Sequence, residues 1–284
     1  MTAFLGVSAS VTGRRWVGLS ENDDRLAQAI AQQTGLPATL SRTLARLGVA
    51  ATDASAYLTP SLRDLMPDPS IFRDMDTAAE RIMQAITKRQ TIAIFADYDV
   101  DGGSSAALLI DYLRQFSIPA TLYVPDRIDE GYGPNEPAMA DLASRHDLII
   151  CVDCGTLSHD AIAAAKDADV IVLDHHMGGE TLPPALAVVN PNRQDEDNDF
   201  GNLCAAGVVF LTLVAVNRNL RAAGQTEPNL IALLDLVALA TVADVAPLTG
   251  LNRALVRQGL KVMTRRDRVG LAALSDAARL TSAP

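Results

Sequence analysis

Residues 92–109 read IAIFADYDVDGGSSAALL, an apolar run followed by aspartates at every second position and then by two glycines. The apolar run predicts a short buried strand, and the residues after the glycines predict a helix that begins near Ser104. Asp97, Asp99 and Asp101 therefore stand where the strand gives way to the helix. The glycines allow a sharp turn there, but three adjacent carboxylates repel one another unless protons or cations hold them together.

The same pattern, a continuous apolar run followed by a helical segment, repeats along the middle of the chain. Apolar strands that alternate with helices are typical of a parallel sheet covered on both faces. We therefore predict an α/β fold, with a mostly parallel β-sheet flanked by helices and a helical C-terminal part. The predicted strands lie within 91–99, 120–126, 147–155, 169–176 and 185–191, and the later helices within about 203–222, 228–242 and 251–264. Residues 1–75 are predicted to form a helical, loop-rich extension, and residues 76–284 the domain that holds the sheet.

Composition is that of an ordinary soluble globular protein, with 49% hydrophobic and 20% charged residues. The net charge of −10 argues against nucleic acid as a partner, unless many of the carboxylates hold cations. Three cysteines in 284 residues fit a reducing, cytoplasmic setting. Cys151 and Cys154 form a CxxC, for which packing at a strand end is favoured over a zinc site because no second CxxC follows. The longest apolar tract, 230–248, contains two aspartates and predicts a buried helix rather than a membrane span.

Other predicted strands also end in acids or histidines. Asp153 closes one strand, and Asp174, His175 and His176 close the next. The carboxyl ends of parallel strands share one edge of a sheet, so these side chains are expected to meet the three aspartates of the opening stretch. Carboxylates joined by imidazoles suit Mn²⁺ or Mg²⁺, and two such ions support hydrolysis of phosphate esters. A single strand-end Asp is more often a helix cap, and a single His pair more often lies on the surface, but three such strand ends together favour a metal site.

Seven motifs, in order along the chain, resemble a known family. The stretches DYDVDG (97–102), VDCGT (152–156), LDHH (173–176) and TVADVAPL (241–248) resemble the DHH phosphoesterase superfamily. The stretches RIDEGYG (127–133), NPNR (190–193) and LCAAGVVF (203–210) narrow the resemblance to the RecJ family of single-stranded-DNA-specific exonucleases. This resemblance covers most of the chain and implies a DHH phosphoesterase catalytic domain over residues 76–284.

The resemblance implies a role for individual residues. It implies metal ligation by Asp97, Asp99, Asp101, Asp153, His175 and Asp244, with Asp153 bridging two ions. It implies catalysis by Asp99, Asp101, Asp153, His175 and His176, the last as a phosphate contact or proton donor. It implies substrate binding by Arg127, Tyr132, His176 and Asn190, with Glu130 in the same loop and Arg193 a weaker candidate.

The implied activity is metal-dependent 5′-to-3′ exonuclease action on single-stranded DNA in repair and recombination, with Mn²⁺ or Mg²⁺ as the cofactor. The implied partners are single-stranded DNA, a single-strand-binding protein and a repair helicase, with no membrane. One alternative is a DHH phosphoesterase that acts on oligonucleotides or cyclic dinucleotides. Another is a non-catalytic scaffold that binds nucleic acid or replication proteins.

The chain departs from the family pattern in two ways. Phe95 occupies a position where some members carry a histidine ligand. The DHHA1 and OB domains of full-length members are absent from this sequence, so the chain is expected to bind metal but to cleave weakly.

Two charged features near the C-terminus leave alternatives open. Asp235 lies nine residues before Asp244 and faces the opposite side of a helix, so it is expected to pack rather than to ligate. The basic stripe of Arg253, Arg257 and Lys261 either follows a DNA backbone or is a solvated face. With aromatic residues at 4%, we expect contact with the backbone rather than readout of bases.

Overall fold

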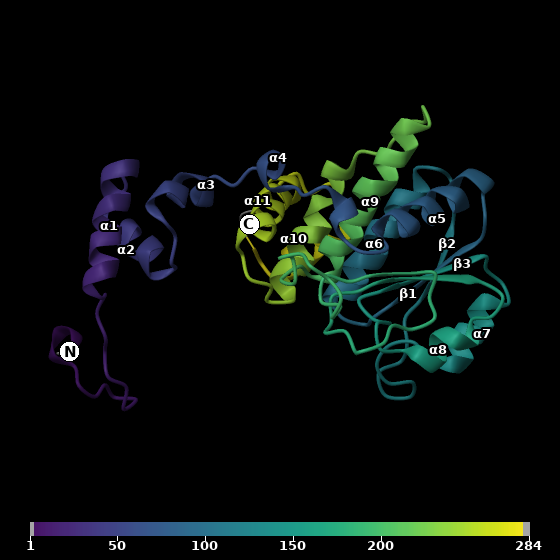
Figure 1. Cartoon of the computed structure of the whole chain (residues 1–284), viewed down its shortest axis with the longest axis horizontal. Helices are drawn as coiled ribbons and strands as arrows, with labels where there is room; N and C mark the ends of the chain where they lie inside the picture. Colours follow the sequence, from purple (N-terminus) through teal and green to yellow (C-terminus); the bar gives the residue numbers. More distant parts are fainter. Residues whose placement is uncertain (1–2, 281–284) are drawn as a thin grey trace. The chain divides into compact units, whose positions relative to one another are not determined.

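The computed structural model describes residues 3–280, which belong to two compact units (Figure 1). The units are Met1–Ser61 and Leu62–Pro284. Residues 62–75, which the sequence analysis placed in the extension, pack with the larger unit. The assignment of the catalytic role to residues 76–284 stays a prediction about function.

The smaller unit is built around two helices. Its elements are η1 (Phe4–Gly6), α1 (Glu21–Thr34), α2 (Ala38–Arg46), η2 (Ala51–Asp53) and α3 (Ala54–Leu58). Helix α1 begins with a capping box, in which the side chain of Ser20 accepts from the backbone N–H of Asp23 and the side chain of Asp23 accepts from Ser20. It ends at Gly35, whose φ of 71° is the left-handed conformation common after helices. A small core that includes Ile30 and Leu44 joins α1 to α2.

The larger unit contains a five-stranded parallel sheet, as the sequence predicts. The strands are β1 (Ile92–Ala96), β2 (Ala120–Tyr123), β3 (Leu148–Val152), β4 (Asp169–Leu173) and β5 (Ala187–Val189), in the order β2-β1-β3-β4-β5. The register places Ile92 of β1 beside Ala120 of β2 and beside Leu148 of β3. The other elements are α4 (Leu62–Leu65), η3 (Pro69–Ile71), α5 (Met75–Lys88), α6 (Val100–Arg114), α7 (Glu136–Ala143), α8 (His159–Ala164), α9 (Ala205–Ala222), η4 (Leu230–Leu233), α10 (Leu234–Ala243), α11 (Gly250–Met263) and α12 (Val269–Ala277).

Helices cover both faces of the sheet, which explains why its central strands are apolar throughout. Ile92 and Ile94 belong to a core shared with α5, α6, α9 and α10, while Ala93 and Phe95 belong to a second core with α7 and α8. This period of two sends successive side chains of β1 to opposite faces. Figure 1 shows α7 and α8 on one side of the strands and α5, α6 and α9 on the other.

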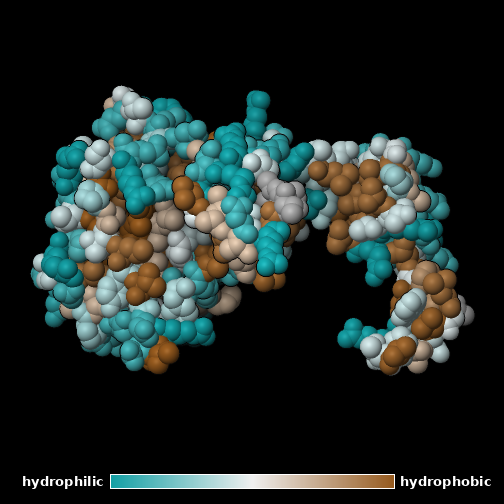
Figure 2. All heavy atoms as spheres, turned by 180° about the vertical axis from the view of Figure 1, so that it is seen from behind, coloured by the Kyte–Doolittle hydropathy of each residue, from teal (hydrophilic) through white to brown (hydrophobic). Residues whose placement is uncertain are grey.

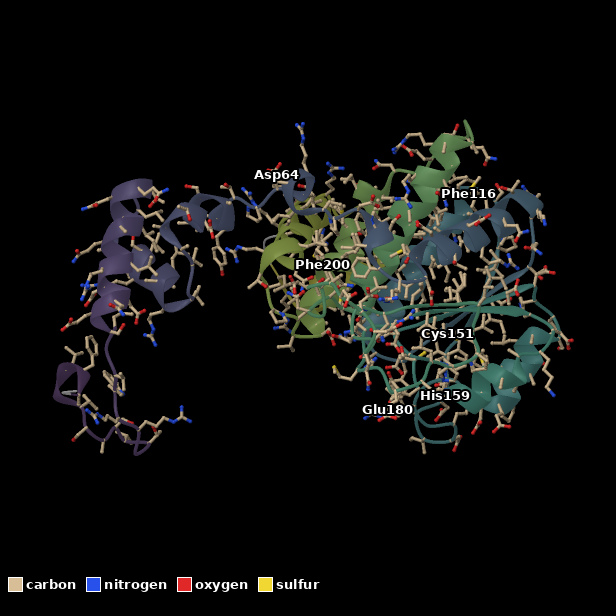
Figure 3. All side chains as sticks on the ribbon, in the orientation of Figure 1. Asp64, Phe116, Cys151, His159, Glu180 and Phe200 are labelled. Carbon is tan, nitrogen blue, oxygen red and sulfur yellow. The ribbon has the colours of Figure 1, made fainter. Side chains whose placement is uncertain are left out.

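The cysteines pack in these cores, as the sequence analysis favoured for the CxxC. Cys151 and Cys154 are buried in the core of α7 and α8, and Cys204 is buried in the core of the opposite face. Burial raises the pKa of the Cys151 thiol, so it stays neutral. Figure 3 labels Cys151 within the sheet, and it also labels Phe200, whose ring centroid lies 5.6 Å from that of Phe72.

The predicted helix over 228–242 is wrong at its start. Residues 230–233 form the 3-10 turn η4, whose N-cap Asn229 accepts from the backbone N–H of Ile231, and α10 begins at Leu234. The apolar tract 230–248 is thus divided between two short elements, and among the described residues no helix has the length and apolar character needed to cross a membrane. Hydrophilic residues are spread across the face of the larger unit drawn in Figure 2, with hydrophobic residues between them.

Helices α10 and α11 approach each other closely at Gly259. A Cβ built on Gly259 would lie 2.1 Å from the carbonyl oxygen of Leu234 and 2.5 Å from Cβ of Ala238. Backbone and a neighbouring Cβ cannot move aside as a flexible side chain can, so only glycine fits this crossing.

We expect Gly259→Ala to lower the free energy of unfolding by about 2 kcal/mol or more, because the helices must separate. Urea unfolding followed by far-ultraviolet circular dichroism measures this change. Gly270→Ala in α12 is the matched control, since a Cβ there meets no atom within 4 Å, and it should leave the free energy of unfolding unchanged or raise it by up to about 1 kcal/mol. Equal midpoints for the two variants would contradict the close crossing.

Candidate metal centre

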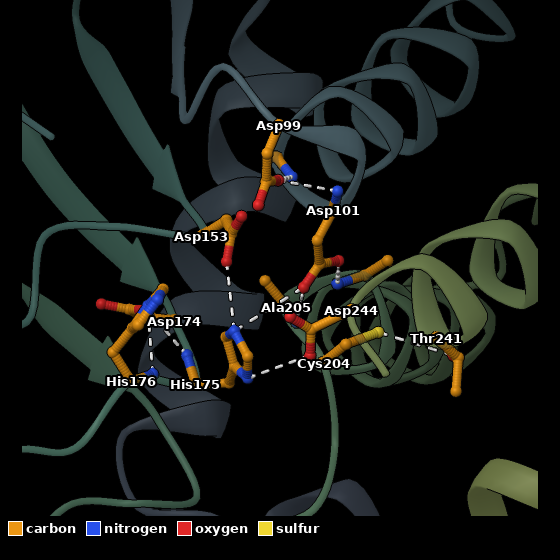
Figure 4. Close-up of polar contacts among 12 residues, drawn as sticks. Asp99, Asp101, Asp153, Asp174, His175, His176, Cys204, Ala205, Thr241 and Asp244 are labelled. Atoms are coloured by element: carbon orange, nitrogen blue, oxygen red, sulfur yellow. Dashed lines mark hydrogen bonds and ion pairs between the residues drawn. The ribbon is translucent and has the colours of Figure 1, made fainter. Parts of the chain in front are cut away.

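The carboxyl ends of β1, β3 and β4 bring the predicted site residues to one edge of the sheet. In the order β2-β1-β3-β4-β5 the sequence of strands reverses between β1 and β3, and open parallel sheets bind ligands at such a point. Side chains gather there from β1, β3 and β4 and from the end of α10 (Figure 4). Three groups have ligand atoms within 4.8 Å of one another: Asp97 with Asp99 and Asp153, Asp101 with His175 and Asp244, and Asp153 with His175 and His176.

Asp99 is the N-cap of α6, which fixes one of its oxygens and leaves the other available. Its Oδ1 accepts hydrogen bonds from the backbone N–H groups of Asp101, at 2.8 Å, and Gly102, at 3.0 Å. Gly102 is required for close approach, since a Cβ there would lie 2.4 Å from the carbonyl oxygen of Asp97. Gly103 has open space at the same point. Both glycines lie inside α6, which begins at Val100 rather than near Ser104, and neither has a positive φ, so the predicted sharp turn at this pair is wrong.

Asp153 follows β3 in an unusual backbone conformation. Its φ of 61° lies in the left-handed region, which costs a residue with a Cβ about 1 kcal/mol and which Asp adopts more readily than most residues. The carboxylate is buried, and its Oδ1 lies 3.3 Å from Nε2 of His175. Burial raises the pKa of Asp153 to about 8, so the metal-free carboxyl holds a proton near neutral pH.

Asp101 points away from its own helix and caps another. Its Oδ2 accepts from the backbone N–H of Ala205 at 2.6 Å and its Oδ1 accepts from that of Ala206 at 2.8 Å, so the buried carboxylate caps α9. Burial raises the pKa of Asp101 in the metal-free protein. The same Oδ2 lies 3.8 Å from Nε2 of His175, which places Asp101 at the centre and also binds α9 to it.

His175 lies between carboxylates from three parts of the chain. Its Nε2 faces Asp153 and Asp101, and its Nδ1 lies 4.0 Å from Oδ2 of Asp244. Burial disfavours the charged imidazole, but contact with Asp153 and the charges of Asp101 and Asp244 outweigh it and raise the pKa of His175 to about 9. Without a metal, protons therefore hold this cluster together.

Asp244 reaches the centre from the C-terminal end of α10, as predicted. The end of that helix is a Schellman motif, in which the N–H of Ala246 donates to Thr241 and the N–H of Val245 donates to Val242. Val245 has a φ of 58°, although β-branched residues rarely adopt the left-handed conformation that glycine usually supplies there. The tight turn fixes the direction in which Asp244 leaves the helix.

His176 is oriented by Asp174, a strand-end residue that the sequence does not predict as part of the site. Nδ1 of His176 lies 2.8 Å from Oδ1 of Asp174, and the imidazole side chain is 45% exposed. Asp174 also accepts from the backbone N–H groups of His175 and His176, and its Oδ2 accepts from that of Thr156 at 3.0 Å. Burial opposes ionisation of Asp174, but the hydrogen bonds from His176 and Thr156 outweigh it and lower its pKa. The only sequence signal for this role was the acid immediately before the His pair.

The RIDEGYG loop borders the centre, as the resemblance implies. The hydroxyl of Tyr132 donates to the carbonyl of Asp153 at 3.0 Å and lies 3.3 Å from the imidazole nitrogens of His176. Arg127 is exposed, and its guanidinium carbon lies 5.2 Å from the ring centroid of Tyr98. Glu130 accepts from the hydroxyl of Tyr123 and therefore braces the loop rather than facing the carboxylates.

Three other candidates lie away from the exposed rim. Asn190 is fully buried, and its amide donates to Oγ1 of Thr156 and to the carbonyl of His176, both at 2.8 Å. Arg193 is buried and pairs with Asp74 and Asp195. Asp235 accepts from Nε of Arg268 at 2.8 Å at the far end of α10, which is the packing role expected for it. These arrangements give Asn190 and Arg193 structural contacts, and a role for Asn190 in substrate binding stays a prediction.

The donor set fits hard divalent cations. Among the described residues, Oδ1 of Asp97 is buried without a hydrogen-bond partner, and burial also raises the pKa of Asp97. Oδ1 of Asp153 is buried too, with Nε2 of His175 at 3.3 Å as its neighbour. Buried carboxylate oxygens without donors are costly unless a proton or a cation occupies them. Oxygen ligands with one or two imidazoles suit Mn²⁺ and Mg²⁺.

Asp174→Asn in the chelator-treated protein should lower the free energy of unfolding at pH 7 by about 2–3 kcal/mol, because an amide cannot accept all four hydrogen bonds. Folding lowers the pKa of Asp174, so its ionised carboxylate stabilises the folded state fully at a pH above the ordinary carboxyl pKa. This contribution to the free energy of unfolding is lost as the pH falls and the carboxylate takes up a proton. The difference from the parent chain in urea unfolding should therefore narrow below about pH 4. Asp160→Asn, an exposed change in α8, is the control, and equal losses for both variants would contradict the buried role.

Affinity for Mn²⁺ should rise with pH between about pH 6 and 9, because a metal must displace the protons that Asp153 and His175 hold. Calorimetry at pH 7 in two buffers of different ionisation enthalpy should show net proton release on binding. Binding without proton release would contradict the protonated state of the metal-free cluster.

Comparison with known proteins agrees with this geometry. Residues 91–241 match the model of the DHH family, N-terminal domain. The single-stranded-DNA-specific exonuclease RecJ of Dickeya dadantii is 39% identical over 263 residues, 87% of this chain and 45% of that protein. RecJ of Thermus thermophilus is 33% identical over 248 residues, 84% of this chain and 36% of that protein. The chain thus spans less than half the length of these relatives.

Solved structures show the same fold. A crystal structure of exonuclease RecJ bound to manganese is 34% identical, with a TM-score of 0.66 over 76% of this chain and 54% of that chain. The structure of Thermus thermophilus RecJ in complex with Mn²⁺ is 28% identical, with a TM-score of 0.73 over 92% of this chain and 36% of that chain. The parallel sheet, the acidic edge between β1 and β3 and the matched residues lead to one conclusion: this chain belongs to the DHH family.

Proposed function

We propose that this chain carries the catalytic centre of a metal-dependent 5′-to-3′ exonuclease that hydrolyses single-stranded DNA. The observation that carries the proposal is the meeting of Asp99, Asp101, Asp153, His175 and Asp244 at one sheet edge, beside a buried carboxylate oxygen of Asp97 that lacks a donor. Relatives named as single-stranded-DNA-specific exonucleases support the choice of substrate.

The proposed ligands are Asp97, Asp99, Asp101, Asp153, His175 and Asp244. Asp153 is proposed to bridge two ions, because its carboxylate belongs to two of the close ligand groups. When bound, a pair of Mn²⁺ or Mg²⁺ ions would polarise the phosphate and lower the pKa of a water molecule enough for it to attack near neutral pH.

His176 is proposed to contact the phosphate and to donate a proton to the departing oxygen. Its imidazole is half exposed at the rim, and the hydrogen bond with Asp174 raises its pKa and holds the ring by Nδ1. Nε2 can then carry the proton that faces the substrate. The hydroxyl of Tyr132 lies 3.3 Å from both ring nitrogens and further limits rotation of the ring.

Arg127 is proposed to bind a phosphate of the strand, since an exposed guanidinium stacked near Tyr98 keeps free hydrogen-bond donors. Polarity of cleavage is taken from the family resemblance. The proposal extends to the setting that the resemblance implies, which is the cytoplasm with a single-strand-binding protein and a repair helicase as partners.

Asp153→Ala should abolish tight Mn²⁺ binding and reduce hydrolysis of a 5′-phosphorylated strand by more than about 100-fold, because the cations would lose their shared ligand. Calorimetry with Mn²⁺ and release of nucleotides from an end-labelled strand measure the two effects. Asp160→Asn should match the parent chain in both. An Asp153→Ala protein that binds and cleaves normally would refute the proposed centre.

Substrate choice separates the exonuclease from its rivals. If the chain hydrolyses a dinucleotide at least as fast as a long 5′-phosphorylated strand, the rates would favour a phosphoesterase that acts on small substrates. A parent chain with no tight Mn²⁺ site would favour a scaffold. Mononucleotides released in order from the 5′ end would support the proposal.

A further inference from the structure

The smaller unit contains a hollow that the proposed chemistry does not use. Its volume is about 770 Å³, and all the residues that line it lie between Phe4 and Arg46. They come from the segment before α1, from α1 itself and from α2. The hollow is therefore a property of this unit alone.

The lining of the hollow is basic, although the chain as a whole is acidic. Arg14, Arg15, Arg42 and Arg46 line it, and Asp24 is its one carboxylate, 3.6 Å from Arg42. The whole chain has a formal net charge of −10. Clustered guanidinium groups in a concave surface attract a polyanion even when the total charge opposes it.

Helix geometry directs two of these arginines into the hollow. Thr39, Arg42, Thr43 and Arg46 line it, and their spacing of three and four residues places them on one face of α2. The opposite face, with Leu44 as its largest buried residue, packs in the core of the unit. The hydroxyl of Thr39 adds a neutral donor beside the guanidinium groups, whereas that of Thr43 donates to the carbonyl of Thr39 at 3.0 Å.

Two aromatic residues complete the lining. Trp16, the only tryptophan of the chain, is 47% exposed, and Phe4 is 50% exposed. Backbone hydrogen bonds hold the segment as a closed loop: the N–H of Phe4 donates to Trp16 at 3.0 Å, and the N–H of Trp16 donates to Val7 at 3.1 Å. The ring of Phe4 lies against Gly18, where a Cβ would come within 2.9 Å of it.

We infer that this hollow is a second, metal-independent binding site for single-stranded nucleic acid. The arginines would contact successive phosphates, and Trp16 would stack on an unpaired base. A half-exposed ring beside arginines favours a single strand over a duplex, whose bases are already stacked, and over an acidic peptide, which has no flat ring to offer. The choice of single-stranded nucleic acid as the ligand rests on the proposed function. The overall aromatic content of 4% gives no sign that Trp16 and Phe4 lie together beside arginines.

The lone tryptophan supplies the test. Titration of the full chain with oligothymidylate in the presence of EDTA should quench the fluorescence of Trp16 in a saturable, salt-dependent manner. Because EDTA removes metal, the result does not depend on whether the chain hydrolyses DNA. Asp153→Ala should show the same quenching even if it loses all Mn²⁺ binding, which separates the two proposals.

Matched arginine variants locate the site. Arg46→Ala should weaken binding several-fold and reduce the slope of log affinity against log salt by about 0.7. Arg25→Ala, an exposed change on α1 outside the hollow, should leave both values unchanged, and Arg46→Lys should retain most of the slope. Three results would each overturn the inference: no quenching of the parent chain, equal quenching by polyglutamate, or equal effects of Arg46→Ala and Arg25→Ala.

Discussion

Repulsion among carboxylates is the constraint on which the larger unit depends. Five acidic side chains and a partly buried imidazole share one sheet edge, and among the described residues Oδ1 of Asp97 is buried there without a donor. The metal-free protein meets this constraint with protons, as the raised pKa values of Asp153 and His175 indicate. A pair of divalent cations would reduce the repulsion further, since each cation could bind several carboxylates at once.

The backbone around the cluster is built to hold those charges in place. Asp153 adopts a left-handed backbone conformation. Both carboxylate oxygens of Asp101 accept hydrogen bonds at the N-terminus of α9, and one carboxylate oxygen of Asp99 caps α6. Helix N-termini stabilise negative charge, so the acids contribute to local folding while they converge. The site and the fold therefore use the same hydrogen bonds.

The sheet and the meeting of its strand ends could be predicted from sequence because both follow from periodicity and from the geometry of parallel strands. The capping of α9 by Asp101 could not, since it joins residues more than 100 positions apart. The buried contacts of Asn190 depend on where Thr156 packs, and no local pattern encodes that. The hollow at Trp16 could not be predicted from composition, because composition averages over the whole chain. An aromatic side chain beside arginines is a local arrangement that only the folded unit shows.

The crossing of α10 and α11 at Gly259 has a further consequence for Asp244. This carboxylate leaves the last turn of α10, so its position is set by how that helix rests on its neighbour. At the crossing the backbone of α11 meets the backbone of α10 and Cβ of Ala238, so no flexible side chain is present to absorb a change in spacing. A change of apolar side chains in this part of the core would therefore tilt α10 as a whole. A small tilt of this helix is enough to move the carboxylate of Asp244 out of line with the other carboxylates of the centre.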